Sequence, residues 1–309
     1  MCRVQFCMRH ISMNMIPTTV WKSQKLFPYL LIAPAVIILL IIFVYPILST
    51  LNLSLHYMNL NQPWKGQPFI GLKNYKDFFT DSNFYYSLWL TAYWTVGTIA
   101  GKMALGFGVA LLLNQRFRGR TLVRAIVLIP WAIPSAMAAI MFSTMFNAQG
   151  VISQMLINLH LTNDYVRWLA STKLAMPVLI MTEVWKSFPF PAIMLLAGLQ
   201  AIPEQLYEAA SVDGANALDR FFKITLPLLR PVIVVTFLLN TILSLKSIDF
   251  HYIMTFGGPA NSTKVLAFYA YHKAFTELRF GKGAALGAIV TVITVLISIF
   301  YLRKRRWEQ

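Results

Sequence analysis

The chain has 309 residues, of which 57% are hydrophobic and only 12% are charged. Soluble domains carry roughly 25% charged residues, so this chain has too little charge to cover its apolar side chains in water. That balance excludes a disordered chain, a coiled coil and an ordinary cytosolic enzyme. The charge that remains is 27 Lys and Arg against 11 Asp and Glu, a net charge of +16. A soluble protein with this excess would point to nucleic acid, whereas in an apolar chain it can report membrane topology.

Six apolar segments are long enough to cross a bilayer as helices, which takes about 20 residues each. They cover residues 27–51, 88–114, 122–146, 174–200, 231–256 and 284–302. The first segment has no charged side chain and is too long for the core of a signal peptide, so we expect it to remain as an anchor. The segments predict an all-α fold: a polytopic integral membrane protein with six transmembrane helices.

Lysine and arginine clusters indicate how these spans are oriented, because an excess of the two residues marks the cytoplasmic ends of spans. The clusters contain Arg3, Arg9, Lys22, Lys25, Arg116, Arg118, Arg120, Arg124, Arg220, Lys223, Arg230, Arg303, Lys304, Arg305 and Arg306. They lie before the first span, after the second, after the fourth and after the sixth. We therefore expect both termini in the cytoplasm, with a segment 1–26, a membrane domain 27–303, a cytoplasmic loop 201–230 and a basic tail 304–309.

The loop 201–230 begins with the pattern of a short surface helix. Pro203 suits the first turn, because the amide hydrogen that it lacks would have no partner there. Glu204 and Glu208 follow and suit the positive end of the helix dipole. Gly214 can end the helix in a left-handed conformation.

The rest of the loop predicts a second short helix over residues 215–224, which Pro227 and Pro231 are expected to stop before the fifth span. Ala209 and Ala210 on the first helix are small, so another surface could approach closely. The loop thus has two interpretations: a helix–turn–helix that docks a partner, or a plain connection between two spans.

The spacing of residues in this loop resembles the EAA loop of ABC-importer permeases. Every named position of that pattern is present, from Glu208-Ala209-Ala210 through Gly214 to Ile224 and Leu226-Pro227. In that family the loop forms coupling helices that dock into a cleft on a cytoplasmic ATPase subunit. The resemblance implies this role for Glu204, Glu208, Ala209, Ala210, Asp213, Gly214, Ile224, Leu226 and Pro227.

The stretches 69–75 and 111–114 resemble sugar permeases, and 257–259, Thr263 and 271–283 resemble the MalF-like subunit of the carbohydrate-uptake permeases. The resemblance covers about residues 25–305. It implies the ABC type I importer permease fold in a bacterial inner membrane and import of an oligosaccharide, glycoside or glycerol-phosphate. It also implies a MalG-like second permease, an ATPase dimer that uses ATP and Mg, and an extracytoplasmic solute-binding protein. The chain itself would bind membrane lipid and sugar but no cofactor and no nucleic acid, and it would not be an enzyme.

The sequence carries no P-loop that could bind ATP. The nearest stretch, 97–103, is one residue short of the pattern, lacks the hydroxyl that binds magnesium and lies within a span. Gly97 and Gly101 instead fit a small-xxx-small packing face. The five histidines are scattered and predict no metal site, and no catalytic constellation can be assembled. The energy must come from another chain or from an ion gradient, and an ion-coupled secondary transporter is the alternative function.

Isolated charges within the spans are costly and are functional hypotheses by default. Glu183 and Lys186 are three residues apart and can pair on one helix face, and Lys246 and Asp249 repeat that spacing. One interpretation is a polar wall along the route of the sugar with aromatic rings nearby; the other is two local salt bridges. The candidate path residues are Glu183, Trp185, Lys186, Phe188, Lys246, Asp249, Phe250 and Tyr252. We expect Lys102 to pair with a neighbouring helix.

Overall fold

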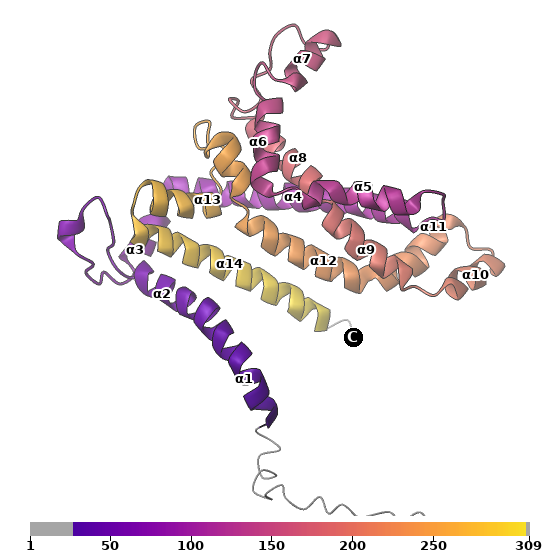
Figure 1. Cartoon of the computed structure of the whole chain (residues 1–309), viewed down its shortest axis with the longest axis horizontal. Coiled ribbons are helices and arrows are strands. Elements are labelled where there is room, and N and C mark those ends of the chain that lie inside the picture. Colours follow the sequence, from indigo (N-terminus) through magenta and orange to yellow (C-terminus); the bar gives the residue numbers. More distant parts are fainter. Residues whose placement is uncertain (1–26, 307–309) are drawn as a thin grey trace, which may run out of the picture. The chain divides into compact units, whose positions relative to one another are not determined.

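The computed structural model describes residues 27–306, and every regular element within this range is a helix (Figure 1). The predicted segment 1–26 and the end of the predicted tail, 307–309, lie outside the described residues. Contacts divide the chain into two compact units, 1–49 and 50–309. The all-α prediction is confirmed.

The first unit holds the apolar helix of the first predicted span. α1 (Phe27–Leu39), the π-turn η2 (Leu40–Val44) and α2 (Tyr45–Ser54) follow one another without a break, and α2 continues into the second unit. Residues Leu31–Ser54 have the length and hydropathy of a membrane span.

The second unit contains the remaining elements. In chain order they are η3 (Pro63–Lys65), α3 (Lys73–Phe79), α4 (Ser82–Asn114), α5 (Arg120–Ala132), α6 (Ser135–Met145), α7 (Val151–Asn158), α8 (Ala175–Ser187), α9 (Pro189–Gln200), α10 (Glu204–Val212), α11 (Ala217–Arg220), η4 (Phe221–Thr225), α12 (Leu226–Lys246), η5 (His251–Thr255), α13 (Leu266–Tyr271), η6 (His272–Thr276) and α14 (Phe280–Arg306).

Two of the predicted spans are pairs of helices with a bend at a proline. α5 and α6 meet at 88° beside Pro134, and α8 and α9 meet at 45° beside Pro189. Proline lacks the amide hydrogen that would continue the helix, and its ring clashes with the preceding turn. Four described helices are long and apolar enough to cross a membrane alone, and up to six spans result when each bent pair counts as one.

Two π-turns lie directly before prolines that remain inside a helix. η2 ends two residues before Pro46, and η4 ends two residues before Pro227. A π-turn widens the helix, which moves the preceding carbonyl groups away from the proline ring. The prediction that Pro227 and Pro231 stop a short helix is therefore wrong: α11, η4 and α12 form one helix that begins at Ala217 and passes through both prolines.

α4 is the central helix of the second unit, and α8, α9 and α12 pack along it (Figure 1). Where α8 meets α4, two glycines leave no space for a side chain. A Cβ atom on Gly97 would lie 2.9 Å from Ile180, and one on Gly101 would lie 2.6 Å from Val184. The small-residue packing face predicted for α4 is confirmed.

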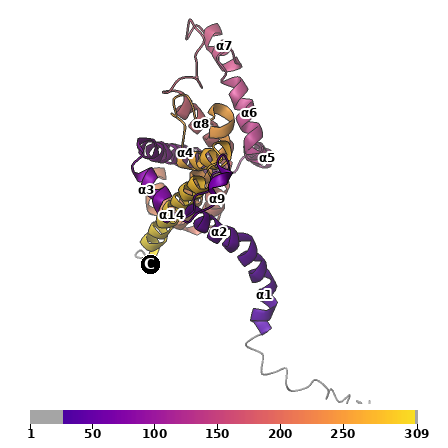
Figure 2. The ribbon, with the colours of Figure 1, turned by 90° about the vertical axis from the view of Figure 1, so that its left-hand side faces the viewer.

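The apolar core joins α4 to α6, α8 and the segment that follows α12. Its aromatic members are Trp94, Phe142, Phe146, Phe250 and Phe268. α6 carries α7 away from the long helices α4, α12 and α14 (Figures 1 and 2). The loop 201–230, the predicted coupling loop, lies at the opposite end of α12 from η5.

Candidate coupling and transport site

α10 begins one residue later than the sequence predicts: Pro203, expected in the first turn, occupies the N-cap in an extended conformation, and Glu204 opens the helix. The Glu204 carboxylate accepts two hydrogen bonds from Nη2 of Arg116, at 2.8 and 3.1 Å. Both side chains are largely exposed, so the pair orients α10 more than it stabilises the fold. The Glu208 side chain is exposed to solvent on the same helix.

The turn after α10 has the hydrogen bonds of a Schellman motif. Gly214 adopts φ +78°, its amide donates to the carbonyl of Ser211 at 3.2 Å, and the amide of Ala215 donates to the carbonyl of Ala210 at 2.9 Å. Asp213 forms the C-cap. The left-handed conformation predicted for Gly214 is confirmed, and it reverses the chain toward α11.

Side-chain contacts hold α10 against the helix that follows. The hydroxyls of Tyr207 and Thr225 lie 2.9 Å apart, and the Arg220 guanidinium donates to the Ser211 hydroxyl at 3.0 Å. Asn216 caps α11 by accepting the amide hydrogen of Asp219 at 2.9 Å. The two helices of the loop therefore form one preorganised unit.

This unit exposes apolar side chains that the chain itself does not cover. The most exposed is Val212, at 89%, followed by Leu218 at 69%, Phe222 at 60% and Leu206 at 43%. Ala209 is exposed beside them, while the other residues of the pattern, Ala210, Ile224 and Leu226, are half-buried and Pro227 is exposed. Apolar side chains gathered on a surface are typical of a protein interface.

A buried polar network joins three of the apolar helices. Nζ of Lys102 on α4 donates to Oε1 of Glu183 on α8 at 2.7 Å and to the hydroxyl of Ser244 on α12 at 3.1 Å. Ser187 donates to the same carboxylate oxygen at 3.2 Å. The prediction that Lys102 pairs with a neighbouring helix is confirmed, and Glu183 pairs with it rather than with Lys186.

Ser244 gathers further side chains from α4. Thr98 donates to its hydroxyl at 3.1 Å, and the indole of Trp94 donates to its carbonyl oxygen at 3.0 Å. The His251 ring meets the Trp94 ring edge-on at 4.3 Å and is fully buried, and neither of its nitrogens has a partner within the described part of the chain.

Sequence reasoning missed Ser244, Thr98 and Trp94 as parts of a site. A signal was present, because α4 carries Thr91, Thr95, Thr98 and Lys102 at spacings of three or four residues. Those spacings place them on one face of a helix, where polar side chains in an apolar segment need partners.

The second predicted charge pair does not form. α12 ends at Lys246, and Ser247 is extended with ψ 122°, so the three-residue spacing no longer places Lys246 and Asp249 on one helix face. Both side chains are exposed, and Lys186 on α8 is half-buried. Within residues 27–306 these three groups make no ion pair with one another.

The four aromatic side chains predicted along the route differ in their exposure. Phe250 is fully buried in the core, and Trp185 packs edge-on against Phe142 with ring centroids 5.0 Å apart. Phe188 is half-buried at the bend between α8 and α9. Tyr252 follows Lys246 and Asp249 closely in sequence, and its side chain is 41% exposed. Among the four aromatic candidates it is therefore the ring that a ligand could reach most easily.

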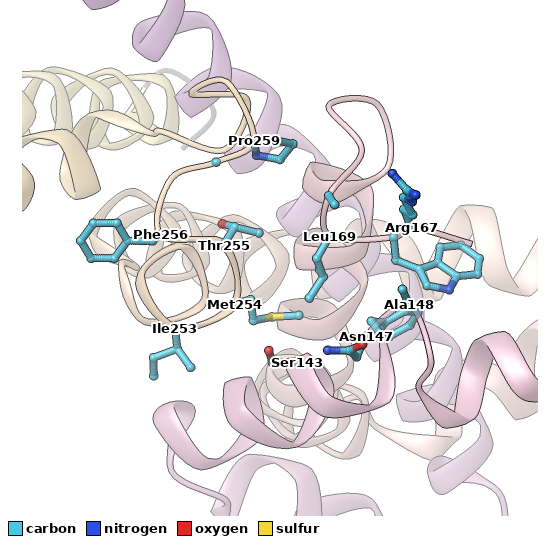
Figure 3. Close-up of a pocket in the computed structure, with 14 residues that line it drawn as sticks. Ser143, Asn147, Ala148, Arg167, Leu169, Ile253, Met254, Thr255, Phe256 and Pro259 are labelled. Atoms are coloured by element: carbon cyan, nitrogen blue, oxygen red, sulfur yellow. The ribbon is translucent and has the colours of Figure 1, made fainter. Parts of the chain in front are cut away.

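A cavity of about 570 Å³ opens between the end of α6, the loop before α8 and η5 (Figure 3). Asn147 and Arg167 supply polar groups to its wall, and Trp168, Phe256 and Pro259 supply apolar surface. It lies at the predicted outer side of the spans, and sequence reasoning did not identify it.

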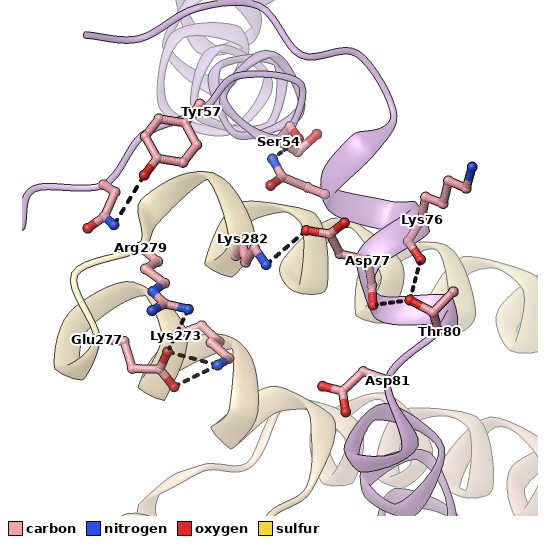
Figure 4. A network of polar contacts seen from close by, with 12 residues as sticks. Ser54, Tyr57, Lys76, Asp77, Thr80, Asp81, Lys273, Glu277, Arg279 and Lys282 are labelled. Carbon is pink, nitrogen blue, oxygen red and sulfur yellow. Dashed lines mark hydrogen bonds and ion pairs between the residues drawn. The ribbon is translucent and has the colours of Figure 1, made fainter. Parts of the chain in front are cut away.

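A polar network at the predicted outer side ties α3 to the start of α14 (Figure 4). Lys282 pairs with Asp77 at 2.9 Å, and Glu277 pairs with Lys273 at 2.7 Å and with Arg279 at 3.7 Å. Burial raises the pKa of the Glu277 carboxyl, but Lys273 and Arg279 lower it by more, so the pKa lies below its ordinary value. Glu277 is therefore held in its charged form.

The described residues contain no group of three or more His, Cys, Asp or Glu side chains that could hold a metal ion. The charged and polar side chains form ion pairs at the surface and one buried network around Lys102 and Glu183, and others lie on the exposed loop 201–230. Such an arrangement can bind a partner and transmit movement between helices.

Comparison with known proteins identifies close relatives. The family model described as "Binding-protein-dependent transport system inner membrane component" matches residues 102–305. The chain is 39% identical over 282 residues to the sulfoquinovosyl glycerol transport system permease protein SmoG of Agrobacterium fabrum, covering 91% of each chain. It is 37% identical over 297 residues to the trehalose/maltose transport system permease protein MalF of Thermococcus litoralis, covering 96% of this chain and 99% of the relative.

A solved structure shares the fold. A chain of a bacterial ABC transporter that imports the acidic polysaccharide alginate matches with a TM-score of 0.79 and 24% identity, covering 93% of this chain and 97% of that chain. Permeases of this family are transport components rather than enzymes. The protein therefore belongs to the binding-protein-dependent transport system inner membrane components, the permease subunits of ABC transporters.

Proposed function

We propose that this chain forms one half of the pore of an ATP-driven importer of a sugar or sugar derivative, and that the unit α10–α11 docks into a cytoplasmic ATPase. The observation that carries the proposal is the preorganised coupling loop, with its Schellman turn at Gly214 and its uncovered apolar side chains Val212 and Leu218. A surface of this kind needs a partner, and the EAA spacing matches permeases whose partner is the ATPase.

The remaining partners follow from the same family. A second, MalG-like permease completes the pore, two ATPase subunits use ATP and Mg, and an extracytoplasmic solute-binding protein delivers the substrate. A related structure of the alginate transporter contains an alginate pentasaccharide-bound periplasmic protein. We place the chain in the bacterial inner membrane with both termini in the cytoplasm, since the basic clusters lie at that side of the spans.

The relatives' names support an oligosaccharide or glycoside as substrate, because they include sulfoquinovosyl glycerol and trehalose/maltose. We assign the contacts along the route to Lys186, Lys246, Asp249 and Tyr252, which are exposed or half-buried, with the half-buried rings of Trp185 and Phe188 beside them. Glu183 and Phe250 are buried in the present conformation and support the wall from behind.

The alternative, an ion-coupled secondary transporter, would use an intramembrane carboxylate to carry a proton. Glu183 is the buried candidate, and it already receives hydrogen bonds from Lys102 and Ser187. These contacts join α8 to α4, so they give Glu183 a role in helix packing that needs no proton transfer. The EAA spacing of the loop 201–230 favours the ATP-driven mechanism.

Uptake of radiolabelled sugar into membrane vesicles distinguishes the two mechanisms. We expect uptake to stop when ATP is depleted and to persist when an uncoupler collapses the proton gradient. Uptake that survives ATP depletion and fails with the uncoupler would refute the proposed function.

The route is tested with a matched pair of variants. Asp249→Asn is expected to lower uptake while ATPase activity of the assembled transporter is retained. Asp164→Asn removes an exposed carboxylate from the loop after α7 and is expected to leave uptake unchanged. Equal uptake by the two variants would contradict the assignment of Asp249 to the route.

A further inference from the structure

Two arginines at the start of α5 converge on one neutral group. Arg120 and Arg124 are four residues apart, and both direct a guanidinium nitrogen at the side-chain amide of Gln200 at the end of α9. With its oxygen turned toward α5, that amide accepts from Nη2 of Arg120 at 2.6 Å and from Nη2 of Arg124 at 2.5 Å. This orientation of the Gln200 amide is assigned from the hydrogen bonds, because the two arginine nitrogens can only donate and must face the amide oxygen.

The positive charge at this place has no anion to balance it. Neither arginine has an ion pair within the described residues, and the Nε atom of each is buried without a partner. Glu204, the carboxylate that lines the adjoining cavity, accepts hydrogen bonds from Nη2 of Arg116 at both of its oxygens. The first amide groups of α5 add the positive end of a helix dipole. Like charges held together in this way favour an anion between them.

A cavity of about 280 Å³ adjoins Arg120 and Gln200, the residue that Arg124 also contacts, and extends to Glu204 and Tyr207 on α10. Arg116 and Arg120 line it together with Asn114, Gln200 and Tyr207. A water molecule takes up about 30 Å³, so the space readily holds a tetrahedral oxyanion with its solvent. The guanidinium fork matches phosphate oxygens in geometry as well as in charge.

We propose that Arg120 and Arg124, with Gln200 between them and Arg116 at the rim, bind a phosphate group. The phosphate belongs either to an anionic lipid headgroup of the adjacent leaflet or to a soluble phosphate ion. In either case it bridges α5 and α9 directly before α10, so the bound anion stiffens the base of the coupling loop. This binding is separate from the sugar route and does not depend on the identity of the sugar.

The experiment uses the complete transporter, purified with its partner subunits. Native mass spectrometry measures retained lipid after exchange into nanodiscs of phosphatidylethanolamine with or without phosphatidylglycerol, and a second arm titrates lipid-depleted transporter with inorganic phosphate. Retained phosphatidylglycerol identifies a lipid source, and a shift in the unfolding midpoint with phosphate alone identifies a soluble source.

The variant Gln200→Glu places a carboxylate between the two arginines while keeping both of them. The new carboxylate repels any anion that approaches the two arginines. Gln200→Glu should therefore weaken the binding of phosphate or phosphatidylglycerol at least about tenfold without unfolding the protein. The matched control, Gln149→Glu, makes the same exchange at an exposed position before α7 and should bind as the unmodified transporter does.

A second pair removes charge instead of adding it. Arg120→Gln with Arg124→Gln should abolish binding, while Arg118→Gln, on the exposed loop between α4 and α5, should not. Equal binding by Gln200→Glu and the unmodified transporter would overturn the proposal. A second result would also overturn the proposal. If phosphatidylglycerol and inorganic phosphate bind the permease pair without its ATPase but not the complete transporter, then a carboxylate of the ATPase, and not a phosphate, occupies the arginines.

Discussion

Lys102 of α4 and Glu183 of α8 form an ion pair of 2.7 Å in which the lysine side chain is 1% exposed and the carboxylate side chain 9%. Ser187 and Ser244 complete the hydrogen bonds of the pair. Two charges so far from water are stabilised only by each other and by these hydroxyls. The pair therefore fixes which faces of α4, α8 and α12 meet.

Removing one member of this pair should destabilise the protein strongly. Lys102→Met leaves the Glu183 carboxylate buried without a cation, which costs about 3–5 kcal/mol. Thermal unfolding of the purified transporter measures the loss. Lys173→Met, at an exposed position, should shift the midpoint little. Adding Glu183→Leu to Lys102→Met should recover most of the stability, and a double variant as unstable as the single one would contradict this account.

The contact between α4 and α8 should tolerate no added methyl group at Gly101. In Gly101→Ala the new Cβ would lie 2.6 Å from Val184, and overpacking of this kind costs about 1–3 kcal/mol. Gly108→Ala on the same helix meets nothing within 4 Å and should be neutral or stabilising, because alanine favours the helix. The unfolding midpoint of Gly101→Ala should fall, while that of Gly108→Ala should stay unchanged or rise; an unchanged midpoint for Gly101→Ala would show that the packing face is not tight.

The coupling loop should be sensitive to the conformation of Gly214. Gly214→Ala has free space around the new methyl group but is strained at φ +78°, by about 1–2 kcal/mol, so the Schellman turn should loosen. We expect sugar uptake to fall while the protein still inserts into the membrane. Gly71→Ala is the matched control, because it also has positive φ with no close contact but lies far from the loop in sequence.

A charge reversal tests the surface of the same loop. Glu208→Lys should reduce both uptake and the ATPase activity that substrate stimulates, because the exposed carboxylate lies on the face assigned to the ATPase. Quantitative co-purification of the ATPase subunits reports docking directly. A variant that retains full ATPase content and normal uptake would refute the docking role of Glu208.

Acid should weaken the network around Glu277. The pKa of this carboxyl is lowered in the folded protein, so its contribution to stability is present above the ordinary value of 4.5 and is lost as the pH falls through the lower folded pKa. The unfolding midpoint of the unmodified protein should therefore drop below pH 4.5. Glu277→Gln removes this titration, so its midpoint should depend less steeply on pH in that range.

Local patterns in the sequence predict the coupling loop well, because its features depend on neighbours in the chain. Pro203 directly precedes α10 as its N-cap, and Gly214 follows the helix in the expected left-handed conformation. The partner of Glu183 could not be read in this way: Lys102 lies 81 residues away, and only the packing of α4 on α8 brings the two together.

Prolines and short charge spacings were misleading for a related reason. Pro227 is a helix breaker by local rules, yet the π-turn η4 accommodates it. Lys246 and Asp249 have the spacing of a helical pair, but the helix ends between them. Both outcomes depend on hydrogen-bond register within the helix, which composition and periodicity do not encode.

The continuity of α11, η4 and α12 gives the protein a mechanical property. The continuous helix joins Ala217 of the surface loop to Ser244, which contacts Lys102, so we expect a displacement of α11 to reach the buried Lys102–Glu183 pair. If the loop 201–230 docks the ATPase as proposed, this helix is the covalent path from the docking surface to the buried polar network.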